Sequence, residues 1–380
     1  MRSTSKAIAK VRGSGINGLN LHEIARMRLI SQQIATTKFS TPGEIVQWMG
    51  AMQAQDFAMA KWAIGIRLPD STESTVQESL NQGEIFRTHL LRPTWHFVSP
   101  QDIYWMLDLT APRIRQSVKS RQRDLELTPA LLKKSNDIIG KVLDRDKQLV
   151  REALVNELTK AKIPTDNNRT YHILLWAELE GIICSGAARG NKQTYSLLAR
   201  FVPKKKGIPR EEAIARLAAR YFTSHSPATL PDFKWWSGLS VAEARSGIEM
   251  NRSFLNPEVI GPETYWLPDS FTIPSATGSS VFLIPAFDEF IISYANRNAV
   301  LDWDTLKKSI SDNGIFRPVI VIDGQVTGLW KRTLKKDILL LETEFYRKHT
   351  KKELSLIQKE SERLGRFLKM EVLLKTGLTF

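Results

Sequence analysis

The spacing of apolar residues changes along the chain, from a helical period in the first two thirds to short β-rich runs after about residue 255. In the first part, apolar residues recur three and four positions apart, which is typical of helices that bury one face. Alternating runs follow groups of such helices, and alternation predicts strands. The pattern therefore predicts an α+β protein in which helix-turn-helix units precede a β-rich, barrel-like C-terminal domain.

The first unit, residues 21–125, has the clearest order of elements. Its helical segments lead to two alternating runs, 85–91 and 94–98, which predict a hairpin interrupted at Arg92 and Pro93. Helices followed by a two-stranded wing describe a winged helix, a fold that usually presents one helix to a groove of DNA. The predicted helices begin at Leu21, Pro42, Phe57 and Thr75, and a further long helix is capped by residues 99–102. Thr41 and Glu44 predict a capping box at the start of the second helix.

Two glutamines lie between the second and third of these helices, in the run Gln53-Ala54-Gln55. If the second helix continued unbroken, the two amides would lie about 200° apart around its axis, at roughly 100° per residue, and could not act on one atom. If that helix yields near Gly50 and Asp56 caps the next one, the run can be extended, and residues two apart then share a face. From the local sequence alone, two solvated glutamines on a helix shoulder remain the alternative interpretation.

A second unit, residues 126–205, repeats this order. Three helical stretches lead to two β-like runs, and residues 186–192 between these runs indicate a flexible basic wing. The stretches lie near 129–143, 147–161 and 169–181, and the runs span 182–185 and 194–201.

A third helix-turn-helix unit, residues 206–258, follows an exposed basic linker. One of its helices carries adjacent tryptophans, Trp235 and Trp236, which point in different directions, so one can pack inside while the other remains available for stacking. Residues 259–380 form the predicted β-rich domain, with one charged helix near 351–367. The predicted strands are 265–267, 281–284, 290–294, 319–322, 326–330 and 339–341, with a hairpin turn at Asp323-Gly324.

The charge balance indicates the kind of partner. The 380 residues contain 54 Lys and Arg against 40 Asp and Glu, which gives a net charge of +14. This excess of positive charge predicts a polyanionic partner, which we expect to be double-stranded DNA rather than an anionic membrane surface. The sequence contains no run of 18 apolar residues, so it predicts no membrane span. The basic arm over residues 1–20 has no apolar signal region. The single cysteine, Cys184, fits a reducing compartment, so we expect a cytoplasmic, nucleoid-associated protein.

A basic stripe lies along the predicted long helix after residue 102. Arg115, Lys119 and Arg123 recur every four residues, and such a stripe can follow a phosphate backbone. The alternative interpretation is a solvated cationic face. The full set of candidate DNA-binding residues is Arg92, His96, Arg115, Lys119, Arg123, Arg189, Lys192, Lys204, Lys205, Trp235 and Trp236.

Other kinds of site have little support. The histidines are scattered without a zinc-binding spacing, so no metal is expected, and neither a phosphate-binding Walker sequence nor a nucleophile elbow occurs. Asp288 and Glu289 could form a carboxylate or metal site, but the side chains of successive residues diverge, which favours a structural role. Cys184 lies in an apolar run and is interpreted as a core residue.

Several segments, taken together in their order, resemble the AlkZ/YcaQ-type winged-helix DNA glycosylases over about residues 21–345. No single segment is specific, whereas the ordered set is. The segments run from Gln53 to Arg67, from Arg92 to Val98, from Ser224 to Leu239, from Pro285 to Arg297 and from Asp323 to Trp330.

The resemblance implies three tandem winged-helix units and a β-rich C-terminal domain around a basic channel for duplex DNA. It also implies a monomeric, monofunctional glycosylase that excises bulky or crosslinked N-alkylated purines without a metal or cofactor. The family's catalytic Gln-x-Gln motif falls on Gln53 and Gln55, and Gln55 places the chain nearer the AlkZ branch than the Gln-x-Asp branch. Two residues depart from the family pattern: Ala54 is smaller than usual, and Pro93 stands where glycine is common.

Two amides suit this chemistry, because a purine alkylated at N7 is cationic and leaves without a strong general acid. The alternative is a non-catalytic winged-helix DNA-binding protein, either a transcription regulator or a lesion-recognition module. A regulator would normally be a dimer, and the sequence contains no heptad repeat or clear dimer helix. A basic structural or membrane-surface protein is less consistent, because the charges are interleaved with folded elements.

Overall fold

The first group of elements lies at the centre of the fold. The computed structural model describes residues 20–204, 206–269, 271, 279–311 and 313–377, so most of the predicted basic arm and Lys205 lie outside the described residues. The first group consists of α1 (Leu21–Ser31), α2 (Pro42–Met49), β1 (Ala51–Gln53), α3 (Phe57–Gly65), α4 (Glu73–Asn81), β2 (Phe86–Leu90) and β3 (Thr94–Val98). The predicted capping box of α2 is confirmed, since Thr41 and Glu44 each bond the other's backbone N–H.

The order of elements from α2 to β3 occurs twice more. The second group consists of α6 (Pro129–Asp146), β4 (Gln148–Val150), α7 (Arg151–Lys160), α8 (Arg169–Leu179), β5 (Ile183–Arg189) and β6 (Lys192–Leu197). The third group consists of α9 (Arg210–Ser224), β7 (Ala228–Thr229), α10 (Leu230–Ser237), α11 (Val241–Glu249), β8 (Leu255–Ile260) and β9 (Glu263–Pro268). Each group has a three-stranded sheet with its last strand in the middle: β1-β3-β2, β4-β6-β5 and β7-β9-β8.

Several predicted boundaries change in the structure. Residues 259–268 belong to the third group, not to the C-terminal domain, because they end β8 and form β9, which lies between β7 and β8. The predicted wing at 186–192 is mostly strand, since β5 continues to Arg189 and only Gly190 and Asn191 separate it from β6. The predicted strand at 290–294 is wrong. It forms the helix α12 (Glu289–Ile292), because Asp288 caps it, and a short buried apolar run does not distinguish strand from helix.

The C-terminal sheet is open, so the barrel-like prediction is wrong. It consists of β10 (Val281–Ile284), β11 (Val319–Ile322), β12 (Gln325–Lys335), β13 (Ile338–Phe345) and β14 (Glu371–Thr376), in that spatial order. Within the described residues, β10 and β14 are its edges and do not pair with each other. A crossover through α14 (Lys351–Leu368) places β14 parallel to β13, and the short helix α13 (Trp303–Ser309) precedes β11.

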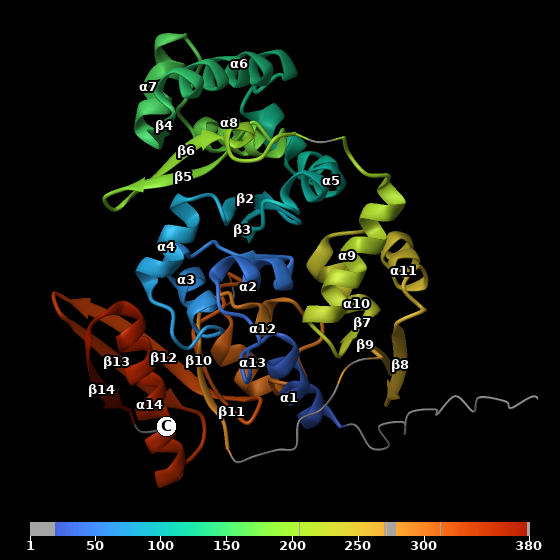
Figure 1. The fold of residues 1–380 in the computed structure, drawn as a ribbon, viewed down its shortest axis with the longest axis vertical. Coiled ribbons are helices and arrows are strands. Elements are labelled where there is room, and N and C mark those ends of the chain that lie inside the picture. The colour runs from blue at the N-terminus through green and yellow to red at the C-terminus, as the bar shows by residue number, and fades with distance from the viewer. Residues whose placement is uncertain (1–19, 205, 270, 272–278, 312, 378–380) are drawn as a thin grey trace, which may run out of the picture.

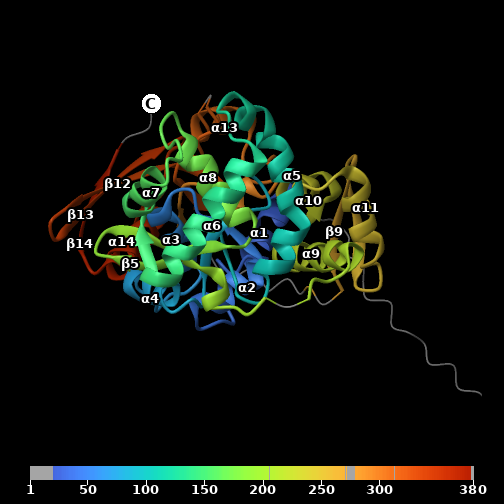
Figure 2. The ribbon, with the colours of Figure 1, turned by 90° about the horizontal axis from the view of Figure 1, so that it is seen from above.

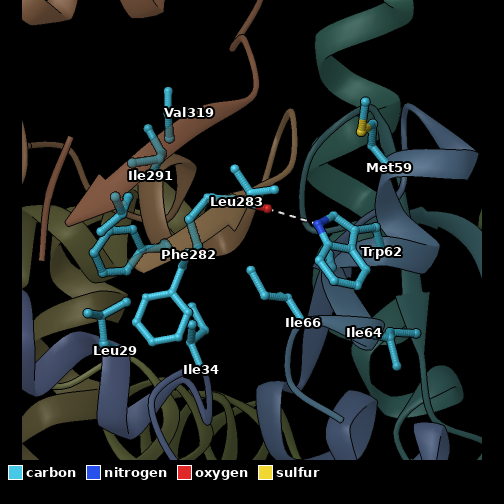
Figure 3. Packing of buried hydrophobic residues seen from close by; sticks show 14 of the residues in the cluster. Leu29, Ile34, Met59, Trp62, Ile64, Ile66, Phe282, Leu283, Ile291 and Val319 are labelled. Carbon is cyan, nitrogen blue, oxygen red and sulfur yellow. Dashed lines mark hydrogen bonds between the residues drawn. The ribbon is translucent and has the colours of Figure 1, made fainter. Parts of the chain in front are cut away.

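One hydrophobic core joins the first group to the C-terminal sheet. Trp62 of α3 is fully buried, and its indole N–H donates to the carbonyl of Leu283 in β10 at 2.8 Å (Figure 3). Figures 1 and 2 show the second group at one end of the molecule, the C-terminal sheet at the other and the third group to one side. The helix α5 (Ile103–Asp124) packs against both α8 and α9. The first group touches the other three parts as well, since α4 contacts β5, α2 contacts α9 and α3 contacts α14.

Candidate active site

The run Gln53-Ala54-Gln55 is not helical, because Gln53 ends β1 and the chain bends at Gln55, so the continuous-helix interpretation is wrong. The helix α2 ends at Gly50, whose φ of 79° is in the left-handed region that favours glycine. The chain then enters β1, where Gln53 pairs with His96 of β3, and the N–H of Ala54 donates to the carbonyl of Trp95 at 2.7 Å. This pairing holds Gln53 and Ala54 on extended backbone, and Gln55 lies at the bend that follows.

Side-chain burial alternates through this run. Met52 and Ala54 are 1% and 0% exposed, Gln53 is partly exposed and Gln55 is exposed. Both glutamine side chains therefore reach the outward face, while Met52 and Ala54 face the core. Ala54 points into the core, so its small size affects the packing beneath the turn rather than the face that carries the amides.

Two charged side chains fix Gln53. The backbone N–H of Gln53 donates to the carboxylate Oε1 of Glu289 at 2.6 Å. The guanidinium Nη2 of Arg92 donates to the side-chain carbonyl Oε1 of Gln53 at 3.2 Å. This contact orients the amide, so its NH₂ group and a second lone pair on Oε1 can still bond to a water or a sugar. Burial lowers the pKa of Arg92, and the negative charge of Glu289 opposes that shift.

Glu289 is a buried anion that joins three parts of the chain. Besides Gln53, its carboxylate accepts hydrogen bonds from the indole N–H of Trp236 at 3.1 Å and from the hydroxyl of Ser293. Burial by itself raises the pKa of Glu289, but the adjacent His225 and Ser293 outweigh it and hold the pKa well below its usual range. The carboxylate is therefore charged at neutral pH.

Asp288 points elsewhere. Its carboxylate forms a bidentate ion pair with the buried guanidinium of Arg67, at 2.8 and 3.0 Å. The divergence expected for successive residues is confirmed, and the two carboxylates do not form a shared site. Among the described residues, no group of three or more His, Cys, Asp or Glu side chains could hold a metal ion.

His96 lies beneath the site rather than on it. It is 0% exposed, and its Nδ1–H donates to the carbonyl of Thr94 at 2.9 Å. Burial and the charge of Arg92 lower the pKa of His96 to about 3, against the opposing charge of Glu289. The imidazole is therefore neutral at neutral pH, and His96 cannot contact DNA directly.

We expect His96→Gln to weaken the acid sensitivity of the fold. The pKa of His96 is about 3 in the folded state, against about 6.5 in an unfolded chain. Between these values the unfolded state binds more protons, so stability is complete above about pH 6.5 and is lost as the pH falls, by up to about 1.4 kcal/mol per pH unit. Denaturant unfolding from pH 7 to 4.5 should give a shallower slope for the variant. Replacement of exposed His22 by Gln is the control, and an unchanged slope in His96→Gln would contradict the assignment.

The predicted DNA contacts separate into exposed and buried sets. Trp236 is 1% exposed and His96 is 0% exposed, so the prediction that they contact DNA directly is wrong. Both side chains instead support the site from below. Arg115 bonds the carbonyl of Leu179 at 2.9 Å and pairs with Glu180 at 3.0 Å, which ties α5 to α8. The exposed candidates are Lys119 and Arg123 on α5, Arg189 and Lys192 at the β5–β6 turn, Lys204, and Trp235, while Arg92 is partly exposed.

Sequence reasoning missed Arg87, which lies directly behind the two glutamines. Its Nε donates to the carbonyl of Ala54 at 2.9 Å, and its Nη1 donates to the side-chain carbonyl of Gln193 on β6 at 2.8 Å. The guanidinium also lies 4.4 Å from the ring centre of Trp95. Arg87 thereby connects the first group to the second, and only the pairing of distant strands could have revealed it.

Comparisons with known proteins agree over most of the chain. The family described as "DNA glycosylase AlkZ-like" matches residues 46–367. The interstrand DNA cross-link repair glycosylase of Streptomyces sahachiroi is 24% identical over 305 residues, which cover 76% of this chain and 81% of that protein. The solved structure of the DNA glycosylase AlkZ from the same organism superposes with a TM-score of 0.78 at 20% identity, covering 94% of this chain and 100% of that one. The chain belongs to the AlkZ-like DNA glycosylase family.

Proposed function

We propose that the protein is a monofunctional DNA glycosylase that binds duplex DNA and hydrolyses the N-glycosidic bond of alkylated purines, of the N7 type and including bulky or crosslinked adducts. The observation that carries this proposal is the pair of amides on one outward face, with Gln53 fixed by Glu289 and Arg92. The relative named as a cross-link repair glycosylase supports the choice of substrate.

Gln53 and Gln55 are the proposed catalytic residues. Alkylation at N7 leaves the purine cationic, so the electrons of the breaking glycosidic bond neutralise it without a strong acid. A water held by the amides attacks the C1′ atom, and its proton passes to solvent. The negative charge of Glu289, one hydrogen bond from the backbone of Gln53, favours the positive charge that develops on the sugar. A glutamine is not a general base, so we expect little activity toward neutral, unmodified bases.

The three helical groups are proposed to be winged-helix units. Each has the element order and the central last strand that a helix-turn-helix with a wing requires. We propose domains at 21–125 and 126–205, a third unit that extends to residue 268 with β9, and a C-terminal domain from there. One copy of the chain carries every residue of the proposed site, which is consistent with a monomer. None of the described helices is long and apolar enough to cross a membrane. The proposed substrate would place the protein with the nucleoid.

The exposed cations of α5 are proposed to contact the DNA backbone. Lys119→Gln or Arg123→Gln should each lower the slope of log affinity against log salt by about one, because each contact releases roughly one counterion. Binding to undamaged duplex DNA across a salt series measures this slope. Lys352→Gln, an exposed lysine on α14, is the control and should leave the slope unchanged. A normal slope in both α5 variants would remove this helix from the proposed interface.

Single-turnover excision tests the function directly. Duplex DNA with one N7-alkylguanine, carrying either a methyl group or a bulky adduct, is incubated with excess protein, and the released base is measured. Release at a rate well above that of spontaneous depurination is expected for at least one adduct. If no base is released while the duplex is bound tightly, the proposed activity is wrong and the protein acts as a DNA-binding module.

A further inference from the structure

Trp235 is an exposed aromatic side chain held rigidly beside the candidate site. It is 46% exposed, and no other Phe, Tyr or Trp side chain whose exposure the structure describes is classed as exposed. Its indole N–H donates to the carbonyl of Ile292, at the end of α12, at 2.8 Å. The ring therefore has a fixed position and an open surface, while adjacent Trp236 bonds Glu289 in the core.

Two guanidinium groups flank this ring. The Cζ atoms of Arg92 and Arg297 lie 5.8 and 5.5 Å from its centre. Arg92 also donates to the side chain of Gln53, so the ring and the proposed catalytic amide share one neighbour. Burial lowers the pKa of Arg297 to about 10, which leaves it charged at neutral pH.

A glycine permits this close arrangement. Gly238, at the C-terminal end of α10, has a φ of 70°, and a Cβ there would lie 2.8 Å from the carbonyl oxygen of Leu91. The end of α10 can therefore approach the β2–β3 turn, which brings Trp235 beside Arg92. The ring comes from the third group, Arg92 and Gln53 come from the first, and Arg297 follows α12, so the cluster forms only in the assembled fold.

We propose that Trp235 stacks on a planar aromatic group of the damaged nucleotide, while Arg92 and Arg297 bind the phosphate beside it. This inference rests on the proposed glycosylase function and names how its substrate is held. An indole face attracts any nucleobase or aromatic adduct, and a paired guanidinium cluster suits a phosphate. The aromatic group is either the purine itself or an aromatic ring of the adduct, and both present the same chemistry to the indole.

The test measures binding and chemistry separately. Wild type, Trp235→Ala and Trp235→Phe are compared on duplexes that carry N7-methylguanine, an N7-guanine adduct with a fused aromatic ring, or a stable abasic analogue. The concentration for half-maximal rate and the saturating rate are determined for each damaged base. Affinity for all three duplexes is measured in the Gln53→Ala background, where the base stays attached. Met250→Ala, another exposed apolar residue of the third group, is the matched control.

Trp235→Ala should weaken binding about tenfold or more to duplexes in which the damaged base is still attached. It should change binding to the abasic analogue little. Loss on both adducts identifies the purine as the stacked group, and loss on the aromatic adduct alone identifies the adduct. Trp235→Phe keeps a ring but loses the bond to Ile292, so it should retain most of the affinity. Arg297→Gln should lower the salt slope by about one, whereas Arg252→Gln, beside Trp266 outside the site, should not.

Two results would overturn the inference. One is equal affinity of Trp235→Ala and wild type on every duplex. The other is an equal defect in Trp235→Ala and Trp235→Phe, which would show that the indole N–H only docks α12. If wild type releases no base from either adduct, the glycosylase proposal fails. The affinity comparison between damaged and abasic duplexes still decides whether Trp235 stacks.

Discussion

Gln53→Ala is expected to lower the single-turnover rate of base excision by at least about 100-fold, while duplex affinity changes little. We expect this size of effect because the loss of one polar group that stabilises a transition state typically lowers a rate by about 10²–10³-fold. The side chain is partly exposed and its backbone is held independently by Glu289, so its removal should leave the turn in place. The measurement is release of N7-alkylguanine by excess protein, together with equilibrium binding to the same duplex.

Two further variants sharpen this result. Gln55→Ala removes the second amide on the same outward face and should also slow excision. Gln101→Ala removes an exposed glutamine outside the run and should have no effect. Excision by Gln53→Ala at the wild-type rate would disprove the assignment of the site. A parallel loss of DNA affinity would instead assign Gln53 to binding.

Glu289→Gln is expected to destabilise the fold by about 3 kcal/mol and to slow excision as well. The carboxylate accepts hydrogen bonds at both oxygens, from the backbone of Gln53 and from Trp236. The glutamine amide has the same shape but must present its NH₂ group to one of these donors, so one buried donor is left unsatisfied. The substitution also removes a paired buried charge, and together these effects cost a few kcal/mol. Urea unfolding measures the stability, and single-turnover excision of the folded variant measures the effect on the site.

Glu360→Gln provides a matched comparison. Glu360 lies on α14, 3.6 Å from Arg363, and burial raises its pKa against the charge of that arginine, so its charged form is less favoured than that of Glu289. We expect a much smaller loss of stability and normal excision. If Glu289→Gln unfolds at the wild-type urea concentration and excises normally, then Glu289 does not hold the turn that carries Gln53.

Local sequence signals predicted local structure well. The capping box that starts α2 and the strands at 281–284 and 319–322 occur where they were predicted, because neighbouring residues determine caps, turns and short apolar runs. Pairing between distant strands has no such local signal. For this reason the sequence pattern places residues 259–268 in the wrong domain and predicts a barrel where the C-terminal sheet is open.

The candidate site shows the same difference between features with a local sequence signal and features that depend on distant contacts. The local sequence singles out the two glutamines, and the resemblance to a family implies their catalytic role. A turn in place of a continuous helix is one of two alternatives that the sequence leaves open. Burial of His96 and Trp236 could not be predicted, since it depends on how α10 and α12 dock on the first group. Arg87 and Glu289 act on the turn through its backbone, and neither contact has a signature in the sequence near residue 53.

The hydrogen bond between Gln53 and Glu289 joins residues 236 positions apart. During synthesis at 5–20 residues per second, roughly 10 to 50 seconds separate the emergence of these two residues from the ribosome. A nascent chain that has already folded its first group therefore presents both glutamines without the carboxylate that holds them. The enzyme would therefore be inactive until Glu289 has emerged, and a chain terminated before residue 289 that still bound DNA would lack the carboxylate that holds Gln53.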